Sequence, residues 1–163
     1  MTVSEFFDLD MLPTDDDLRA AKLLKLVVFE PYVRKGKEWW AGQAARLPDA
    51  TPMQAAVKKL LKIVPTYVDA KPGDYEAIAD DLERILKDLS SPDAPLVGKI
   101  LATNYRGLSQ RRIGKFGAAL SSFKGAQVLA TDYANDVSHP VRTLWLGYVG
   151  FNLVTFSPKM SPK

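Results

Sequence analysis

Apolar residues recur every three or four positions along most of this chain, and this spacing is typical of amphipathic helices. A first helix is predicted to begin at Thr14, whose side chain can cap free backbone N–H groups, and to end near Glu30 because Pro31 follows. Its apolar stripe would face a core and its basic residues would face water. A second helix is predicted within residues 32–47.

The clearest helix signals follow in the next segment of the chain. Thr51 is the expected N-cap, a proline occupies the first helical position, and Gln54 completes a capping box with Thr51. Pro65 is expected to limit this helix. The following helix is predicted to begin after a Pro-Gly turn, with Asp74 as its cap, and residues 90–95 are predicted to form a break.

Residues 96–137 are again helical in pattern but rich in glycine, alanine and serine. A break is predicted at residues 107–109, where Ser109 could cap a new helix. Small residues four apart would then form ridges that allow a neighbouring helix to approach closely. These ridges consist of Gly114, Ala118 and Ser122, and of Gly117, Ser121 and Gly125. Residues 139–156 are predicted to be a buried terminal helix, with a short hairpin as the alternative.

These segments together predict an all-α fold, a helical bundle of about five or six helices. The length of 163 residues suits one domain with a sizeable core. We expect an acidic N-terminal segment at residues 1–13, a single helical domain at residues 14–156 and a flexible tail at residues 157–163.

The chain contains no cysteine and one histidine, His139. This composition excludes disulfides, cysteine-ligated zinc, thiol catalysis and zinc sites built on several histidines. We predict no metal site and no cofactor. No signal peptide is visible in the given chain and no apolar run suits a transmembrane segment, so we expect a soluble protein whose compartment and oligomeric state stay open.

Charge is distributed unevenly along the sequence. Residues 1–17 carry six acidic residues and no basic one, whereas residues 94–131 carry six basic residues and no acidic one. Such blocks can mark interaction surfaces. The alternatives are that the acidic block covers the basic segment of the same chain, or that each face is simply solvated.

Residues 113–120, with the sequence IGKFGAAL, resemble the I-G-x-x-G-x-x-[IL] core of the KH nucleic-acid-binding domain. In that family the G-x-x-G loop joins two helices and approaches the nucleic-acid backbone closely, and the fold includes three strands. The resemblance covers eight residues. It implies a phosphate contact near Lys115, whereas the small-residue spacing favours close helix packing.

The adjacent tryptophans Trp39 and Trp40 would point about 100° apart on a helix, so that one can fill the core while the other lies at a surface. We predict a non-catalytic accessory or adaptor protein that docks on a larger protein assembly, including an extrinsic subunit of a membrane complex. The predicted partner-binding residues are Trp39, Trp40, Arg106, Arg111, Arg112, Lys115 and Lys124.

Two other functions remain open from the sequence. The basic segment 99–124 could bind an anionic partner, either nucleic acid or an acidic membrane surface. An unrecognised helical enzyme could use Asp132, Asp136 and His139, although no nucleophile motif, P-loop or dinucleotide-binding fingerprint is present in the chain.

Overall fold

The computed structural model describes residues 37–92 and 94–136, which form five α-helices and one short 3-10 turn. The elements are α4 (Lys37–Ala45), α5 (Pro52–Val68), η2 (Pro72–Asp74), α6 (Tyr75–Asp88), α7 (Leu96–Arg112) and α8 (Phe116–Asp136). No strand occurs within these ranges, so the predicted all-α bundle is confirmed. The predicted helix from Thr14, the segment 139–156 and the expected domain limits lie outside the described residues.

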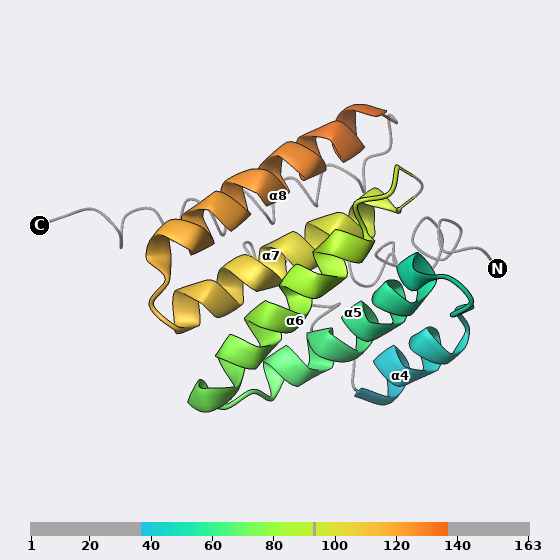
Figure 1. Cartoon of the computed structure of the whole chain (residues 1–163), viewed down its shortest axis with the longest axis horizontal. Coiled ribbons are helices and arrows are strands. Elements are labelled where there is room, and N and C mark those ends of the chain that lie inside the picture. The colour runs from blue at the N-terminus through green and yellow to red at the C-terminus, as the bar shows by residue number, and fades with distance from the viewer. Residues whose placement is uncertain (1–36, 93, 137–163) are drawn as a thin grey trace, which may run out of the picture.

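Each helix packs mainly against its neighbours in the chain, and α5 also contacts α7 (Figure 1). Helices α5 to α8 alternate in direction, so the end of α7 and the start of α8 lie at the same end of the bundle as the end of α5. Helix α7 is central, since residues 100–109 are all buried except the partly buried Arg106.

One continuous apolar core connects the five helices. Helix α6 supplies Ile78, Leu82 and Ile85, which are all buried. Trp40 of α4 is also fully buried, with 0% of its side chain exposed. The largest fully buried side chains are Trp40, Phe123, Leu60, Leu61, Leu82 and Leu89.

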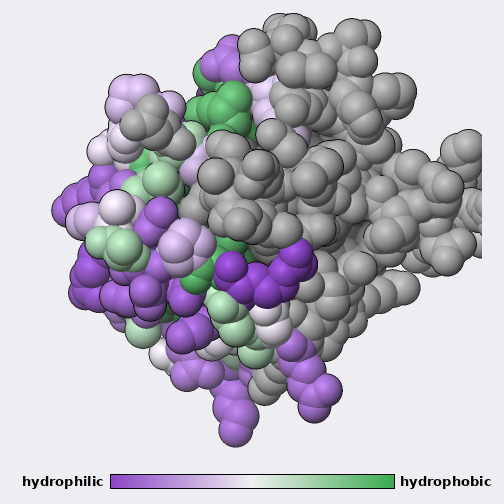
Figure 2. Space-filling model, turned by 90° about the vertical axis from the view of Figure 1, so that its right-hand side faces the viewer, coloured by the Kyte–Doolittle hydropathy of each residue, from purple (hydrophilic) through white to green (hydrophobic). Residues whose placement is uncertain are grey.

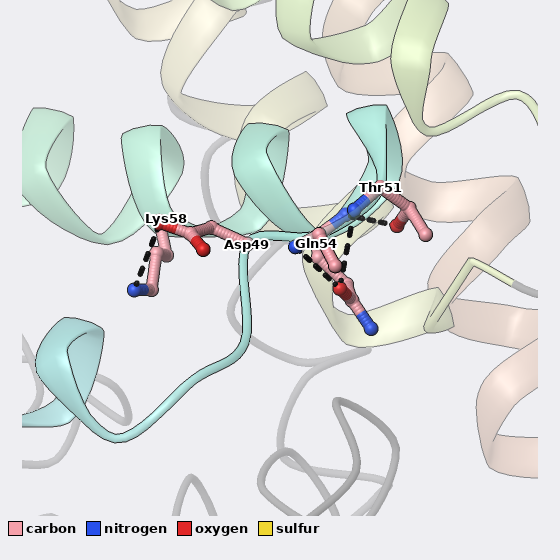
Figure 3. Close-up of polar contacts among 5 residues, drawn as sticks. Asp49, Thr51, Gln54 and Lys58 are labelled. Carbon is pink, nitrogen blue, oxygen red and sulfur yellow. Dashed lines mark hydrogen bonds and ion pairs between the residues drawn. The ribbon is translucent and has the colours of Figure 1, made fainter.

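The predicted start of α5 is confirmed in detail (Figure 3). The Thr51 hydroxyl accepts a hydrogen bond from the Gln54 backbone N–H at 3.2 Å, and the Gln54 side-chain oxygen accepts one from the Thr51 N–H at 3.3 Å. These bonds form the capping box and satisfy two N–H groups that the helix leaves without an internal partner. Lys58 pairs with Asp49 at 3.6 Å across the same turn.

At the start of α6, Asp74 occupies the predicted N-cap position, but its carboxylate does not cap that helix. It accepts a hydrogen bond from the Lys71 backbone N–H at 3.0 Å and so closes the 3-10 turn η2 instead.

The prediction that Pro65 limits α5 was wrong, because the helix continues to Val68. Proline lacks only its own N–H, so it removes a single helical hydrogen bond near the end of the helix. The next residue adds a local bond, since the Thr66 hydroxyl donates to the Lys62 carbonyl at 2.9 Å. Val64 and Tyr67 also pack into or against the core, which favours one more helical turn.

The predicted break at residues 107–109 was also wrong, because α7 runs unbroken from Leu96 to Arg112. Gly107 costs up to about 1 kcal/mol relative to alanine inside a helix, but burial of nearly every surrounding side chain outweighs this cost. Ser109 is buried within the helix, and its carbonyl accepts the N–H of Ile113.

Close packing of small residues does occur between α7 and α8, through some of the predicted residues and through others that were not predicted. Gly107 lies against Phe123, where an added Cβ would meet the ring at 2.8 Å. The small residues Ala119, Ser122, Ala126 and Ala130 of α8 are all buried. Of the predicted ridges, Ser122 is buried and Gly125 is partly buried against Thr103 of α7. Gly117, Ala118 and Ser121 are exposed, and Gly114 precedes the helix.

The surface over the described residues is mainly hydrophilic on the side that Figure 2 presents, which is the right-hand side of Figure 1, with smaller hydrophobic areas between polar ones. Two large hydrophobic residues are notably exposed within the described part, Phe116 at 50% and Val128 at 61%, and both belong to α8.

Candidate functional site

Three of the predicted basic residues, Arg111, Arg112 and Lys115, come together where α7 turns into α8. We call these three residues the basic turn. The Gly114 N–H donates to the Arg111 carbonyl at 3.2 Å, and the Lys115 N–H donates to the Gln110 carbonyl at 2.9 Å. This pair of bonds is a Schellman motif, which requires a left-handed residue after the helix. Gly114 provides it with φ of +79°.

The Schellman motif gives the first glycine of the KH-like segment a local explanation. As in the KH family, the glycine-containing turn joins two helices. The KH fold also needs three strands, and residues 37–92 and 94–136 contain none. The resemblance is therefore limited to a helix–turn–helix segment.

Arg111 and Arg112 occupy the last turn of α7, where the helix dipole stabilises positive charge. Arg112 is also held by aromatic side chains. Its guanidinium lies 5.7 Å from the centre of the Tyr75 ring and hydrogen-bonds Tyr67, and this hydrogen bond is the main reason that the pKa of Arg112 is raised. Both arginines therefore have a structural role besides any role in binding.

The aromatic residues under Arg112 form a cluster that joins three helices. The Tyr67 ring lies 5.5 Å from that of Tyr75 and 5.1 Å from that of Tyr105, both in tilted or edge-on arrangements. Burial raises the pKa of Tyr67, although the Arg112 hydrogen bond acts in the opposite direction. Sequence reasoning missed this cluster, because its members lie on different helices and no local spacing connects them.

Lys115 differs from the two arginines because it lies at the start of α8. Its carbonyl accepts the first helical hydrogen bond, from the Ala119 N–H at 2.9 Å, so it occupies the N-cap position. A lysine cannot accept a hydrogen bond from the free N–H groups there, and its charge opposes the helix dipole. The first turn of α8 contains no acidic residue that would offset this charge.

The next two residues, Phe116 and Gly117, belong to the first turn of α8. Phe116 exposes half of its side chain. Gly117 lies inside the first turn of α8, where a Cβ would meet nothing within 4 Å, so packing within the chain does not require glycine. Lys115 and Gly117 thus depart from what helix stability alone favours, as surface residues with a function often do.

Arg106 was predicted as a contact residue, but it belongs to the interface between α7 and α8. Its Nε donates to the Ser122 hydroxyl at 3.1 Å, and that hydroxyl donates to the Gln110 side-chain oxygen at 2.7 Å. Burial lowers the pKa of Arg106, and the charge of Glu83 partly offsets this effect. Arg106 therefore helps to align the two helices.

The other predicted residues do not extend the basic turn into one surface. Lys124 is exposed on α8, nine positions after Lys115, which is about 13 Å along the helix. Trp40 is fully buried, so it cannot contact a partner directly, in agreement with the expectation that one tryptophan fills the core. The side chain of Trp39 lies outside the described residues.

The structure brings no metal-binding cluster together in its described part, where no group of three or more histidine, cysteine, aspartate or glutamate residues could hold an ion. Asp132 is exposed on α8. Its proposed catalytic partners, the side chain of Asp136 and residue His139, lie outside the described residues.

Comparison of the chain with protein family models, with curated proteins and with solved structures gives no match. None of the described helices is long and apolar enough to cross a lipid bilayer.

Proposed function

We propose that the protein is a non-catalytic helical adaptor that docks on an acidic surface of a larger protein assembly through the basic turn. The observation that carries this proposal is the sequence Lys115-Phe116-Gly117, which places a cation, a half-exposed aromatic ring and a glycine at the start of α8. Their presence is explained if a partner contacts the start of this helix.

The surrounding charge indicates the chemistry of the partner. Arg111 and Arg112, in the last turn of α7, place two further positive charges beside Lys115. A carboxylate-rich protein surface would complement this charge, while the Phe116 ring would supply an apolar contact. We include extrinsic subunits of membrane complexes among such assemblies, by analogy of size and shape alone.

The test compares Lys115→Glu with Lys87→Glu, an equal charge change at an exposed lysine on α6. Tagged full-length proteins are incubated with extract of the native cells, and the retained proteins are quantified by mass spectrometry. We expect one partner to be retained by the wild type and by Lys87→Glu, and to fall about tenfold with Lys115→Glu.

Stability measurements separate docking from folding. A glutamate at position 115 would complement the helix dipole, so Lys115→Glu should raise the free energy of unfolding by about 0.5 kcal/mol while it weakens binding. A partner retained equally by all three proteins, or binding lost only in step with stability, would contradict the proposal.

A second candidate function is binding of a phosphate-rich polymer or an acidic membrane surface. The specific observation that favours it is the G-x-x-G turn between two helices, with Lys115 exposed within it. Fluorescence anisotropy with labelled single-stranded RNA, and co-sedimentation with phosphatidylserine vesicles, would test it at low and high salt. Absence of binding at low salt, or binding unchanged by Arg111→Ala combined with Arg112→Ala, would remove this candidate.

A further inference from the structure

Helices α5 and α6 lie side by side (Figure 1). Residues of both helices line a small groove between them. Each helix contributes positions spaced by three and four, so the same face of each helix lines the groove. The lining residues are Lys59, Lys62 and Ile63 of α5, and Asp81, Arg84, Ile85 and Asp88 of α6.

The groove combines an apolar floor with charged walls. Ile63 is partly exposed and packs against the main core, and Ile85 is buried within that core. A floor that is part of the core keeps its shape, because core side chains are closely packed. An apolar centre with a charged rim is also the usual composition of a protein-docking surface.

The two walls differ in how their charges are matched. On α6, Arg84 is paired with Asp81 at 2.9 Å. On α5, neither Lys59 nor Lys62 lies within ion-pair distance of a carboxylate of the described residues, whereas their neighbour Lys58 is paired with Asp49. The α5 wall therefore has positive charge that the described residues do not neutralise.

The volume restricts what could occupy the groove. It is about 220 Å³, which is below the range of roughly 300–1,000 Å³ that is usual for small-molecule sites. A space of this size suits one large apolar side chain, and the lysines above it suit carboxylates on either side of that side chain.

We propose that the α5–α6 groove binds an apolar anchor residue flanked by acidic residues, supplied by a protein partner. The proposal rests on the docking function proposed above and adds a second contact surface, on a different pair of helices from the basic turn. Asp88 opposes such a partner by like-charge repulsion, so the groove would favour a segment whose acidic residues lie toward α5.

The probe for this proposal is a capped pentapeptide with a central leucine and two glutamates on each side. Full-length protein labelled at isoleucine methyl groups is titrated with this peptide, and the chemical shifts of the Ile63 and Ile85 methyl groups are followed by NMR. We expect saturable shifts at Ile63. Replacing the leucine by serine, or the glutamates by lysines, should weaken binding about tenfold.

Variants of the protein test the two walls separately. Lys59→Glu combined with Lys62→Glu should weaken peptide binding at least about tenfold, whereas Asp88→Asn should strengthen it by about twofold to fivefold. Lys71→Glu, a charge reversal at an exposed lysine that does not line the groove, is the control and should leave the affinity unchanged.

Three results would overturn the proposal. One is the absence of Ile63 shifts at millimolar peptide, and another is equal binding of the glutamate and lysine peptides. The third is binding that appears only after the six acidic residues of positions 1–17 are neutralised, since the groove would then be occupied by this chain itself. If the peptide does not bind but the cellular partner is still retained through Lys115, the groove is not a docking site, and the docking function proposed for the basic turn is unaffected.

Discussion

At the scale of single residues, two glycines of the α7–α8 hairpin have opposite roles. Gly107 allows the helices to approach, because an added Cβ would lie 2.8 Å from the Phe123 ring and 3.1 Å from the Ser122 Cβ. Phe123 is fully buried, so its ring has little room to move. Gly107→Ala should therefore lower the free energy of unfolding, since overpacking costs about 1–3 kcal/mol and the gain in helix propensity is at most about 1 kcal/mol. Urea denaturation measures this change.

Gly117→Ala should have the opposite sign. Nothing lies within 4 Å of the position that a Cβ would take, so only the gain in helix propensity remains, up to about 1 kcal/mol. If Gly117 allows a partner to approach closely, the same substitution should also weaken docking in the pull-down assay. A destabilised Gly117→Ala protein would contradict the view that packing within the chain does not need this glycine.

At the scale of the elements, features that depend on residues close in sequence were predictable, and features that depend on burial in the folded protein were not. The capping box of α5 needs only Thr51 and Gln54, three positions apart, and the structure contains it as predicted. The break expected at Ser109 failed because the surroundings of α7 bury that residue, which the sequence nearby does not reveal. The prediction that Gly114 belongs to a packing ridge was wrong for a related reason, because α7 ends just before this residue.

The α5 cap also makes a quantitative prediction. Thr51→Ala removes the hydroxyl that accepts the Gln54 N–H, so the free energy of unfolding should fall by about 1 kcal/mol. Thr66→Ala is the control, because the Thr66 hydroxyl donates to a carbonyl within the helix and alanine has the higher helix propensity. Thr66→Ala should be neutral or slightly stabilising, and equal losses from both substitutions would argue against the capping account.

At the scale of the whole molecule, the basic residues of segment 99–124 are contiguous in sequence but divided in space. The bundle uses Arg106 between helices, holds Arg112 against tyrosines and leaves Lys115 and Lys124 exposed. Charge counting identified the segment, but it could not separate structural cations from available ones. The groove between α5 and α6 was likewise hidden, because its two walls come from separate helices.

The tyrosine cluster joins α5, α6 and α7, and it makes stability depend on alkaline pH. Burial raises the pKa of Tyr67 above its ordinary value of 10.0, so the folded protein holds this proton more tightly than the unfolded chain does. The stabilisation is therefore complete below pH 10 and is lost as the pH rises through the raised pKa.

Between about pH 9 and about pH 11 the urea midpoint of the wild type should fall more than that of Tyr67→Phe, which has no proton to lose. The Phe variant should be less stable at neutral pH, by about 1 kcal/mol, because it lacks the hydrogen bond from Arg112. Parallel decreases in the two proteins would show that Tyr67 ionises equally readily in the folded and unfolded states, and the cluster would then not be a pH-sensitive joint between the three helices.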